Sequence, residues 1–193
     1  MNFNNKQLKL LQDTSFFEEK SALLKAVETQ MSLICDDLKL DYSEKSKKIS
    51  SAPKKATAKI TRGENLKGLP YLILDFPQHF SKTEIFSFRL LFWWGNGFTL
   101  FLHLKNSQLE GLKNLIVREK ETLNNEAFYV STNGDEWEHD YLAANYIKMG
   151  NFKADEPHNF IKFAFPISFN QSSDLKQIII QKTNFLLSFL AKL

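Results

Sequence analysis

The stretch IFSFRLLFWWGNGFTLFLHLK, residues 85–105, carries the strongest fold signal in this chain of 193 residues. On both sides of the glycines at 95 and 97, every even-numbered residue is apolar, while the odd-numbered residues mix polar and apolar side chains. A period of two is typical of a β-strand that has one face in a core. The stretch therefore predicts an antiparallel hairpin in which Trp94 faces the core and Trp93 faces the other side.

The register of this hairpin follows from its apolar side chains, which have to share one face. Even residues must then pair with even residues, a condition that a three-residue loop at 95–97 meets and a two-residue turn does not. Gly97 suits the left-handed backbone conformation that such a loop requires. The loop predicts these cross-strand pairs: Trp94 with Phe98, Phe92 with Leu100, Arg89 with His103 and Leu91 with Phe101.

The odd-numbered residues of the hairpin form a second face, called the mixed face below, on which aromatic and basic side chains lie together. A face open to water does not usually gather Trp93, Phe101 and a leucine, so we expect something to cover it. One interpretation is that another part of the fold, or a second copy of the chain, covers it. The other is a concave site in which the aromatic rings hold an apolar ligand while Arg89 and His103 bind its anionic end.

Strand and helix signals elsewhere place this hairpin in an α+β domain. The remaining elements are expected as strands at 71–76, 127–132, 136–141 and 160–169, and as helices at 15–40, 107–124 and 173–193. The second and third of these strands flank Asn133 and Gly134, a turn signal typical of a hairpin. We predict an antiparallel sheet of five or six strands, with a C-terminal helix packed on its apolar face and an N-terminal helical segment.

The helix expected at 15–40 begins with a capping-box pattern, Ser15 followed by Glu18. Its apolar residues recur at spacings of three and four, which places them on one stripe: Leu24, Val27, Met31, Ile34 and Leu38. Such a stripe packs on the protein's own sheet more often than it forms a coiled coil, and the sequence leaves both open.

The net charge of +3 is concentrated in one segment. Residues 45–62 hold seven basic side chains and no acidic one, so the rest of the chain is acidic on balance. The part at 42–58, rich in Ser, Lys and Ala, cannot bury enough apolar surface to offset its ordering entropy. We therefore divide the chain into a helical segment at 1–41, a basic flexible linker at 42–58 and an α+β domain at 59–193, and we expect the first and last parts to form one compact unit.

The basic linker raises the question of nucleic acid, which would bind its lysines with a strong dependence on salt. No aromatic residue follows Tyr42 within the linker for bases to stack on. We therefore expect at most a weak contact of this kind.

Several classes of function are set aside by what the sequence lacks. Cys35 is the only cysteine, which excludes an internal disulfide and fits a reducing, cytoplasmic compartment. No apolar run approaches the length of a signal peptide or a membrane span, so no membrane contact is expected. Phosphate-loop, zinc and nucleophile–base patterns are missing, and the acidic run at 135–140 is typical of a solvated edge. We predict no catalytic residue, metal or cofactor.

Residues 62–77, RGENLKGLPYLILDFP, followed by FR at 88–89 and FWWGN at 92–96, resemble a segment of an uncharacterised bacterial protein family. The resemblance covers about residues 60–105 and implies no activity. It implies that Arg62, Glu64 and Arg89 act together, with Arg62 or Glu64 at the mouth of the mixed face. The alternative is a turn held by its own side-chain hydrogen bonds.

These patterns favour a non-enzymatic interaction or scaffold protein of the cytoplasm, one that forms a homodimer through the mixed face or the N-terminal helix. The alternative function is a carrier or enzyme for a small apolar, anionic ligand. Its candidate ligand-binding residues are Arg89, His103, Trp93, Phe101, Arg62 and Glu64. A third function is the weak nucleic-acid contact through the linker.

Overall fold

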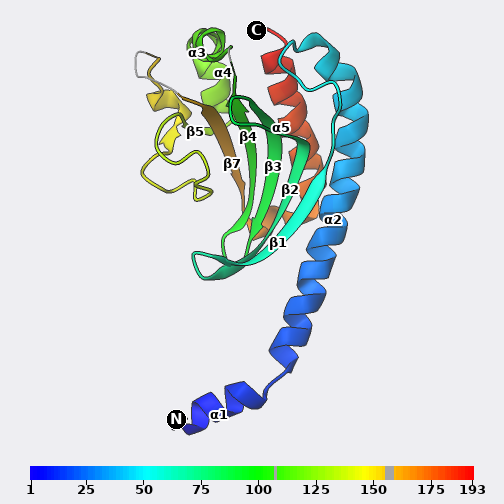
Figure 1. The fold of residues 1–193 in the computed structure, drawn as a ribbon, viewed down its shortest axis with the longest axis vertical. Coiled ribbons are helices and arrows are strands. Elements are labelled where there is room, and N and C mark those ends of the chain that lie inside the picture. The colour runs from blue at the N-terminus through cyan, green and yellow to red at the C-terminus, as the bar shows by residue number, and fades with distance from the viewer. Residues whose placement is uncertain (107, 155–158) are drawn as a thin grey trace.

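The computed structural model describes residues 1–106, 108–154 and 159–193 and folds them into a twisted sheet with two long helices against one face (Figure 1). The described residues form seven strands, each antiparallel to its neighbours, in the order β1-β2-β3-β4-β7-β5-β6. The strands are β1 (Lys59–Leu66), β2 (Leu69–Phe80), β3 (Ile85–Trp93), β4 (Gly97–Lys105), β5 (Tyr129–Ser131), β6 (Ile147–Lys148) and β7 (Ile161–Ile167). The α+β class and the antiparallel sheet are confirmed, with seven strands in place of the five or six expected.

The helices lie mostly at the two ends of the chain, as predicted. They are α1 (Asn5–Gln12), α2 (Ser15–Lys45), α3 (Leu109–Arg118), α4 (Lys120–Asn125) and α5 (Leu175–Leu190), with short 3-10 turns η1 (Ser46–Lys48), η2 (Met149–Asn151) and η3 (Phe169–Asp174). α2 and α5 lie side by side (Figure 1). Of the helix expected to begin at Ser107, that first residue lies outside the described residues, and α3 begins at Leu109.

The core lies between the even-numbered face of the sheet and the two long helices. It includes Leu90 and Phe92 of β3, Leu100 and Leu102 of β4, Met31 and Ile34 of α2, and Ile179 and Leu186 of α5. Burying each such side chain contributes about 1.5–3 kcal/mol. The prediction of the core face is confirmed, and the apolar stripe of α2 packs on the protein's own sheet. Trp94 is half-buried at the edge of this core.

The hairpin at 85–105 has the predicted faces, but the predicted register is wrong by two residues. The observed pairs are Phe92 with Phe98, Arg89 with Phe101 and Ser87 with His103. Gly97 explains the shift, because a Cβ there would lie 2.7 Å from the carbonyl oxygen of Ile167 in β7. Gly97 therefore belongs inside the sheet, and the three-residue loop is 94–96, where Gly95 with φ +78° makes the turn.

The predicted hairpin at 127–141 is wrong in its second strand. β5 pairs with β6 and with β7, and residues 132–146, called the strap below, leave the sheet between β5 and β6. Within the strap, the carbonyl oxygens of Glu136 and Glu138 accept hydrogen bonds of 3.1 and 2.7 Å from Nζ of Lys162 in β7. These two strap carbonyls thus bond to a buried lysine side chain and not to the backbone of a neighbouring strand.

The segment at 42–58, expected as a linker, is folded along its first half. α2 continues to Lys45, beyond the boundary expected at 41, and η1 follows it. Tyr42 and Ile49 are buried in the main core, and the hydroxyl of Tyr42 donates to the carbonyl of Pro53 at 3.1 Å. Two buried side chains therefore attach to the core a segment whose composition alone is typical of a linker.

Candidate functional site

The strap covers the mixed face. Tyr146 of the strap packs with Leu91 and Phe101 in a second, smaller apolar cluster, with Trp93 at its margin. Phe101 is completely buried, and half-buried Trp93 donates from Nε1 to the carbonyl of Leu66 at 3.0 Å. Of the two interpretations of this face, the structure therefore has the one in which another part of the fold covers it.

Arg89 fastens the strap to the sheet. Its guanidinium makes a two-pronged ion pair with the buried carboxylate of Asp75, its neighbour on β2, at 2.6 and 2.9 Å. It also donates to Nε2 of His139 in the strap. Because arginine has no acceptor, His139 must be neutral with its proton on Nδ1. Burial, and then the charges of Lys162 and Arg89, lower the pKa of His139, which agrees with that state.

Lys162 is the second fastening point. It is almost completely buried, and its Nζ lies 4.8 Å from the centre of the Phe101 ring in addition to its two bonds to strap carbonyls. Burial, and then the charge of Arg89, lower the pKa of Lys162 to about 7. A lysine in this state can serve as a base or nucleophile. Here the strap and Phe101 enclose it, so its role in this conformation is to position the strap.

His103 lies on the same face, opposite Ser87 and not opposite Arg89 as the predicted register had it. Its ring contacts the rings of Trp137 and Phe160 edge-on, and its Nε2 is 3.6 Å from a carboxylate oxygen of Glu136. Among the described residues, nothing forms a hydrogen bond with this nitrogen. Burial first, then nearby Lys162, lower the pKa of His103 to about 3, so the ring is neutral at neutral pH.

Arg62 and Glu64 lie away from this cluster. Arg62 pairs with Leu72, a residue of the main core, and donates to Glu64 at 3.0 Å. Glu64 also accepts from Lys20 of α2 at 2.6 Å. The expectation that Arg62 or Glu64 stands at the mouth of the mixed face is therefore not met, because both contact the helix-covered side of the sheet. Arg62 and Glu64 lie within β1, and together with Lys20 they form an ion-pair cluster.

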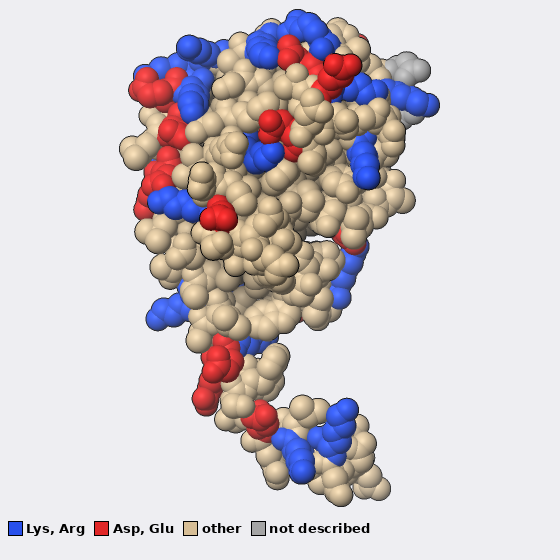
Figure 2. All heavy atoms as spheres, turned by 180° about the vertical axis from the view of Figure 1, so that it is seen from behind, with Lys and Arg blue, Asp and Glu red and all other residues tan. Residues whose placement is uncertain are grey.

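The N-terminal part of the chain has a different character, because it projects from the body of the molecule (Figures 1 and 2). Residues 1–23, all of them described and called the arm below, contain no buried side chain. Leu10 and Leu11 are each 64% exposed, Phe17 is 62% exposed and Phe16 is 56% exposed. A water-exposed group of this kind typically marks an interaction site.

The exposed arm was not predicted from the sequence, although the length of α2 and its apolar stripe indicate it. The 31 residues of α2 span roughly 46 Å at 1.5 Å per residue, whereas the longest strand, 12 residues of β2, spans roughly 40 Å. Phe16 and Phe17 continue the apolar stripe of α2 towards its start, but the first buried residue of α2 is Leu24. The stripe therefore extends beyond the body that could cover it.

An apolar hollow of about 410 Å³ lies on the body next to the base of the arm. Its lining comes from α2, the β3–β4 loop region and η3: Leu23, Val27, Phe92, Trp94, Gly95, Phe98, Phe169 and Ser172. The ring of Phe16, from the arm, borders it by meeting the Trp94 ring edge-on at 6.5 Å. Phe169 closes the opposite part with ring contacts of 6.1 and 6.2 Å to Phe92 and Phe98. The hollow volume lies in the range of small binding sites.

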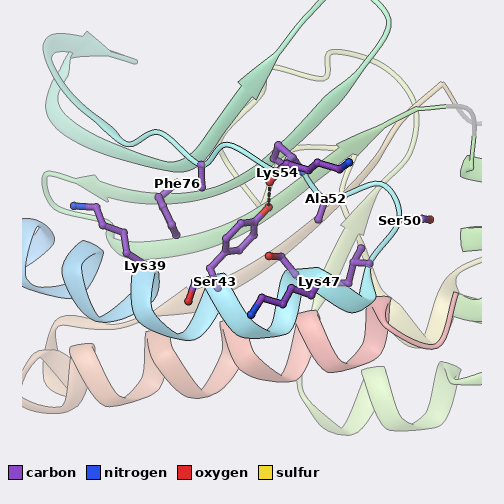
Figure 3. A pocket seen from close by; sticks show the side chains of 12 residues that line it. Lys39, Ser43, Lys47, Ser50, Ala52, Lys54 and Phe76 are labelled. Carbon is purple, nitrogen blue, oxygen red and sulfur yellow. Dashed lines mark hydrogen bonds between the residues drawn. The ribbon is translucent and has the colours of Figure 1, made fainter.

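A larger trough, about 750 Å³, lies between the end of α2 and the segment that follows it (Figure 3). Tyr42 and Phe76 form its apolar floor, and Lys39, Lys47 and Lys54 lie around it. Lys39 is paired with Asp36, and Lys47 with Glu44, both within one turn of helix. The three lysine side chains also point in different directions (Figure 3). The trough therefore lacks the converging donors that binding of one anion requires.

Comparisons of this chain with protein-family models, with curated proteins and with solved structures found no match. Within the described residues, no helix is long and apolar enough to cross a membrane. In the same residues, no cluster of three or more His, Cys, Asp or Glu side chains could hold a metal ion. The arm, the hollow and the buried polar cluster are therefore the features of this structure that bear on its function.

Proposed function

We propose that this chain is a non-enzymatic interaction protein of the cytoplasm that forms a homodimer through its N-terminal arm. The observation that carries the proposal is the arm, which exposes large apolar side chains along 23 residues without burying one of them. Exposed apolar groups on this scale favour association, because contact with a partner removes them from water.

The length of α1 supports the same conclusion. α1 has eight residues and a complete capping box between Asn4 and Gln7. Isolated helices shorter than roughly 12–15 residues are only marginally stable in water, even with good caps. A partner that buries Leu8 and Leu11, which are three apart on one face of α1, would supply the missing stabilisation.

Charge makes a second copy a suitable partner. Residues 1–12 contain Lys6 and Lys9 and no acidic residue, whereas residues 13–19 contain three acidic residues and no basic one. Figure 2 shows blue, basic side chains at the far end of the arm and red, acidic ones nearer to the body. Two arms that run antiparallel about a twofold axis bring these unlike charges together twice, as a self-complementary interface requires.

The experiment is sedimentation velocity on the full chain and on the double variant Leu8→Glu, Leu11→Glu. We expect the full chain to sediment as a dimer and the variant as a monomer with an unchanged circular dichroism spectrum, because two carboxylates would have to be buried in the interface. The matched control is Leu40→Glu, at an exposed leucine of α2 outside the arm, which should remain dimeric. A full chain that is monomeric at every concentration contradicts the proposal.

The ligand-binding alternative has less support from the geometry. Arg89, His103 and Phe101 lie beneath the strap. The guanidinium of Arg89 is directed at Asp75 and His139, and the ring of His103 packs against the ring of Trp137. A small molecule would have to displace the strap and its bonds to Lys162. Nucleic-acid contact through the basic segment stays a prediction, to be tested by the salt dependence of binding.

A further inference from the structure

We infer that, within this homodimer, the tip of each arm is seated in the apolar hollow of the other copy. The inference rests on the proposed homodimer and adds to it the seat of the arm and the occupant of the hollow. It differs from a dimer in which the two arms contact only each other, since the hollow would then stay empty.

The chemistry of the two surfaces matches. The hollow is lined almost wholly by aromatic and aliphatic side chains, and Leu23 and Phe169 at its edge are about half exposed. The tip of the arm presents Phe3 and Leu8, both exposed as well. An amphipathic helix that places an apolar face in an apolar groove is a common mode of recognition between polypeptides.

The lengths of α1 and of the start of α2 determine which part of the partner the tip of the arm reaches. The hollow begins at Leu23, eight residues after the start of α2, which is roughly 12 Å along the helix axis. α1 also has eight residues and spans roughly 12 Å. When the two arms run antiparallel and meet near Ser15, α1 of one copy extends along the first turns of the partner's α2 and ends beside the hollow.

Charge favours the same placement. In this arrangement, antiparallel about Ser15, Lys9 of one copy lies opposite Ser21 of the other, within about one helical turn of Glu18 and Glu19. Lys20, the first basic residue after that stretch, is already paired with Glu64 at 2.6 Å, so it does not neutralise these two carboxylates. The basic helix thus meets an acidic entrance on its way to an apolar seat.

Cysteine pairing between separate chains tests the seat. In a Cys35→Ala background, which removes the chain's one thiol, one chain carries Leu8→Cys and a second carries Ser172→Cys at the lining of the hollow. Mixing the two under mild oxidation should give a disulfide-linked dimer that contains one chain of each kind. The control mixture replaces Leu8→Cys by Leu40→Cys and should give no such product.

The outcomes separate the inference from the proposed function. Dimers in sedimentation without the Leu8–Ser172 cross-link would overturn the seat and leave the homodimer standing. A single chain that carries both Leu8→Cys and Ser172→Cys and forms the disulfide as a monomer would show that the arm folds back on its own body, which contradicts both. Absence of any dimer likewise overturns both.

A variant of the hollow gives an independent readout. Phe169→Glu places a carboxylate at the edge of the seat, and the exposed position of this side chain lets the body fold. We expect dimer affinity to fall about tenfold or more, as for loss of an interface anchor. Val117→Glu, at a similarly exposed apolar residue on α3, is the control and should leave affinity unchanged. Equal affinities of Phe169→Glu and the unmodified chain would overturn the seat.

Discussion

At the scale of single residues, the buried polar cluster of the mixed face holds the strap in place. Asp75 lies on β2, Arg89 on β3 and His139 in the strap, so one guanidinium links three parts of the chain. Lys162 adds two bonds from β7. A buried charge is tolerated only when it is paired or hydrogen-bonded, which makes each member of this cluster costly to remove alone.

Replacing Arg89 by Ala tests this role. The variant leaves the carboxylate of Asp75 buried without its partner, so we expect the free energy of unfolding to fall by about 3–5 kcal/mol in urea denaturation. The matched control is Arg62→Ala, which removes an exposed ion pair with Glu64 and should cost less than about 1 kcal/mol. Similar losses for the two variants would refute the assignment of Arg89 as the link between sheet and strap.

The two histidines of the cluster make the protein sensitive to acid. The pKa of His103 is about 3 in the folded protein against 6.5 for an ordinary histidine, and the pKa of His139 is lowered as well. Between these values the unfolded chain binds more protons, so stability is lost as the pH falls below about 6.5. We expect a loss of up to about 1.4 kcal/mol per pH unit for each histidine. Urea denaturation at pH 7 and pH 5 measures it.

His103→Asn should reduce this pH dependence by its own share, whereas His79→Asn, at a half-exposed position, is the control. Equal stability of the unmodified protein at pH 7 and pH 5 would show that the histidines of the strap cluster are not held neutral.

At the scale of elements, alternation of residue types was enough to assign faces but not register. Even-numbered apolar residues at 86–104 identified the core side of β3 and β4 correctly. The register depended on which glycine turns the chain, and that choice is made by β7, which lies more than 60 residues further along. A local pattern carries no information about a neighbour that approaches from so far along the chain.

Gly97 and Gly95 offer a matched pair for this point. Both have positive φ, so replacing either by Ala costs about 1–2 kcal/mol in backbone strain. Only at Gly97 would the new Cβ meet another backbone, 2.7 Å from the Ile167 oxygen, whereas nothing lies within 4 Å at Gly95. We therefore expect Gly97→Ala to lower the thermal midpoint clearly more than Gly95→Ala. The reverse order would contradict the observed register.

The strap is a second case in which a local sequence pattern did not show which distant part of the chain packs against it. Asn133 and Gly134 are a strong local signal for a tight hairpin, but the backbone after them bonds to Lys162 and packs its tyrosines on the mixed face. The sequence did indicate that this face must be covered. It could not indicate which segment does so, because the match between the strap and Arg89, His103 and Lys162 exists only in the folded chain.

At the scale of the whole molecule, both faces of the sheet in the body are covered, whereas the arm has no buried side chain. Helices α2 and α5 cover one face of the sheet and the strap covers the other, so the ligand-binding residues predicted on the mixed face lie inside the fold. The arm and the apolar hollow beside it leave large apolar side chains uncovered next to each other. The arm presents projecting apolar side chains and the hollow is an apolar recess. In the proposed dimer, the arm of each copy fills the hollow of the other.

Sedimentation velocity of the unmodified chain, over a wide range of protein concentration, is the most direct test of the proposed homodimer. We expect a boundary with twice the mass of one chain, which shifts to the mass of one chain when Leu8 and Leu11 are both replaced by Glu. A boundary that stays at the mass of one chain throughout, with the arm intact, would contradict it.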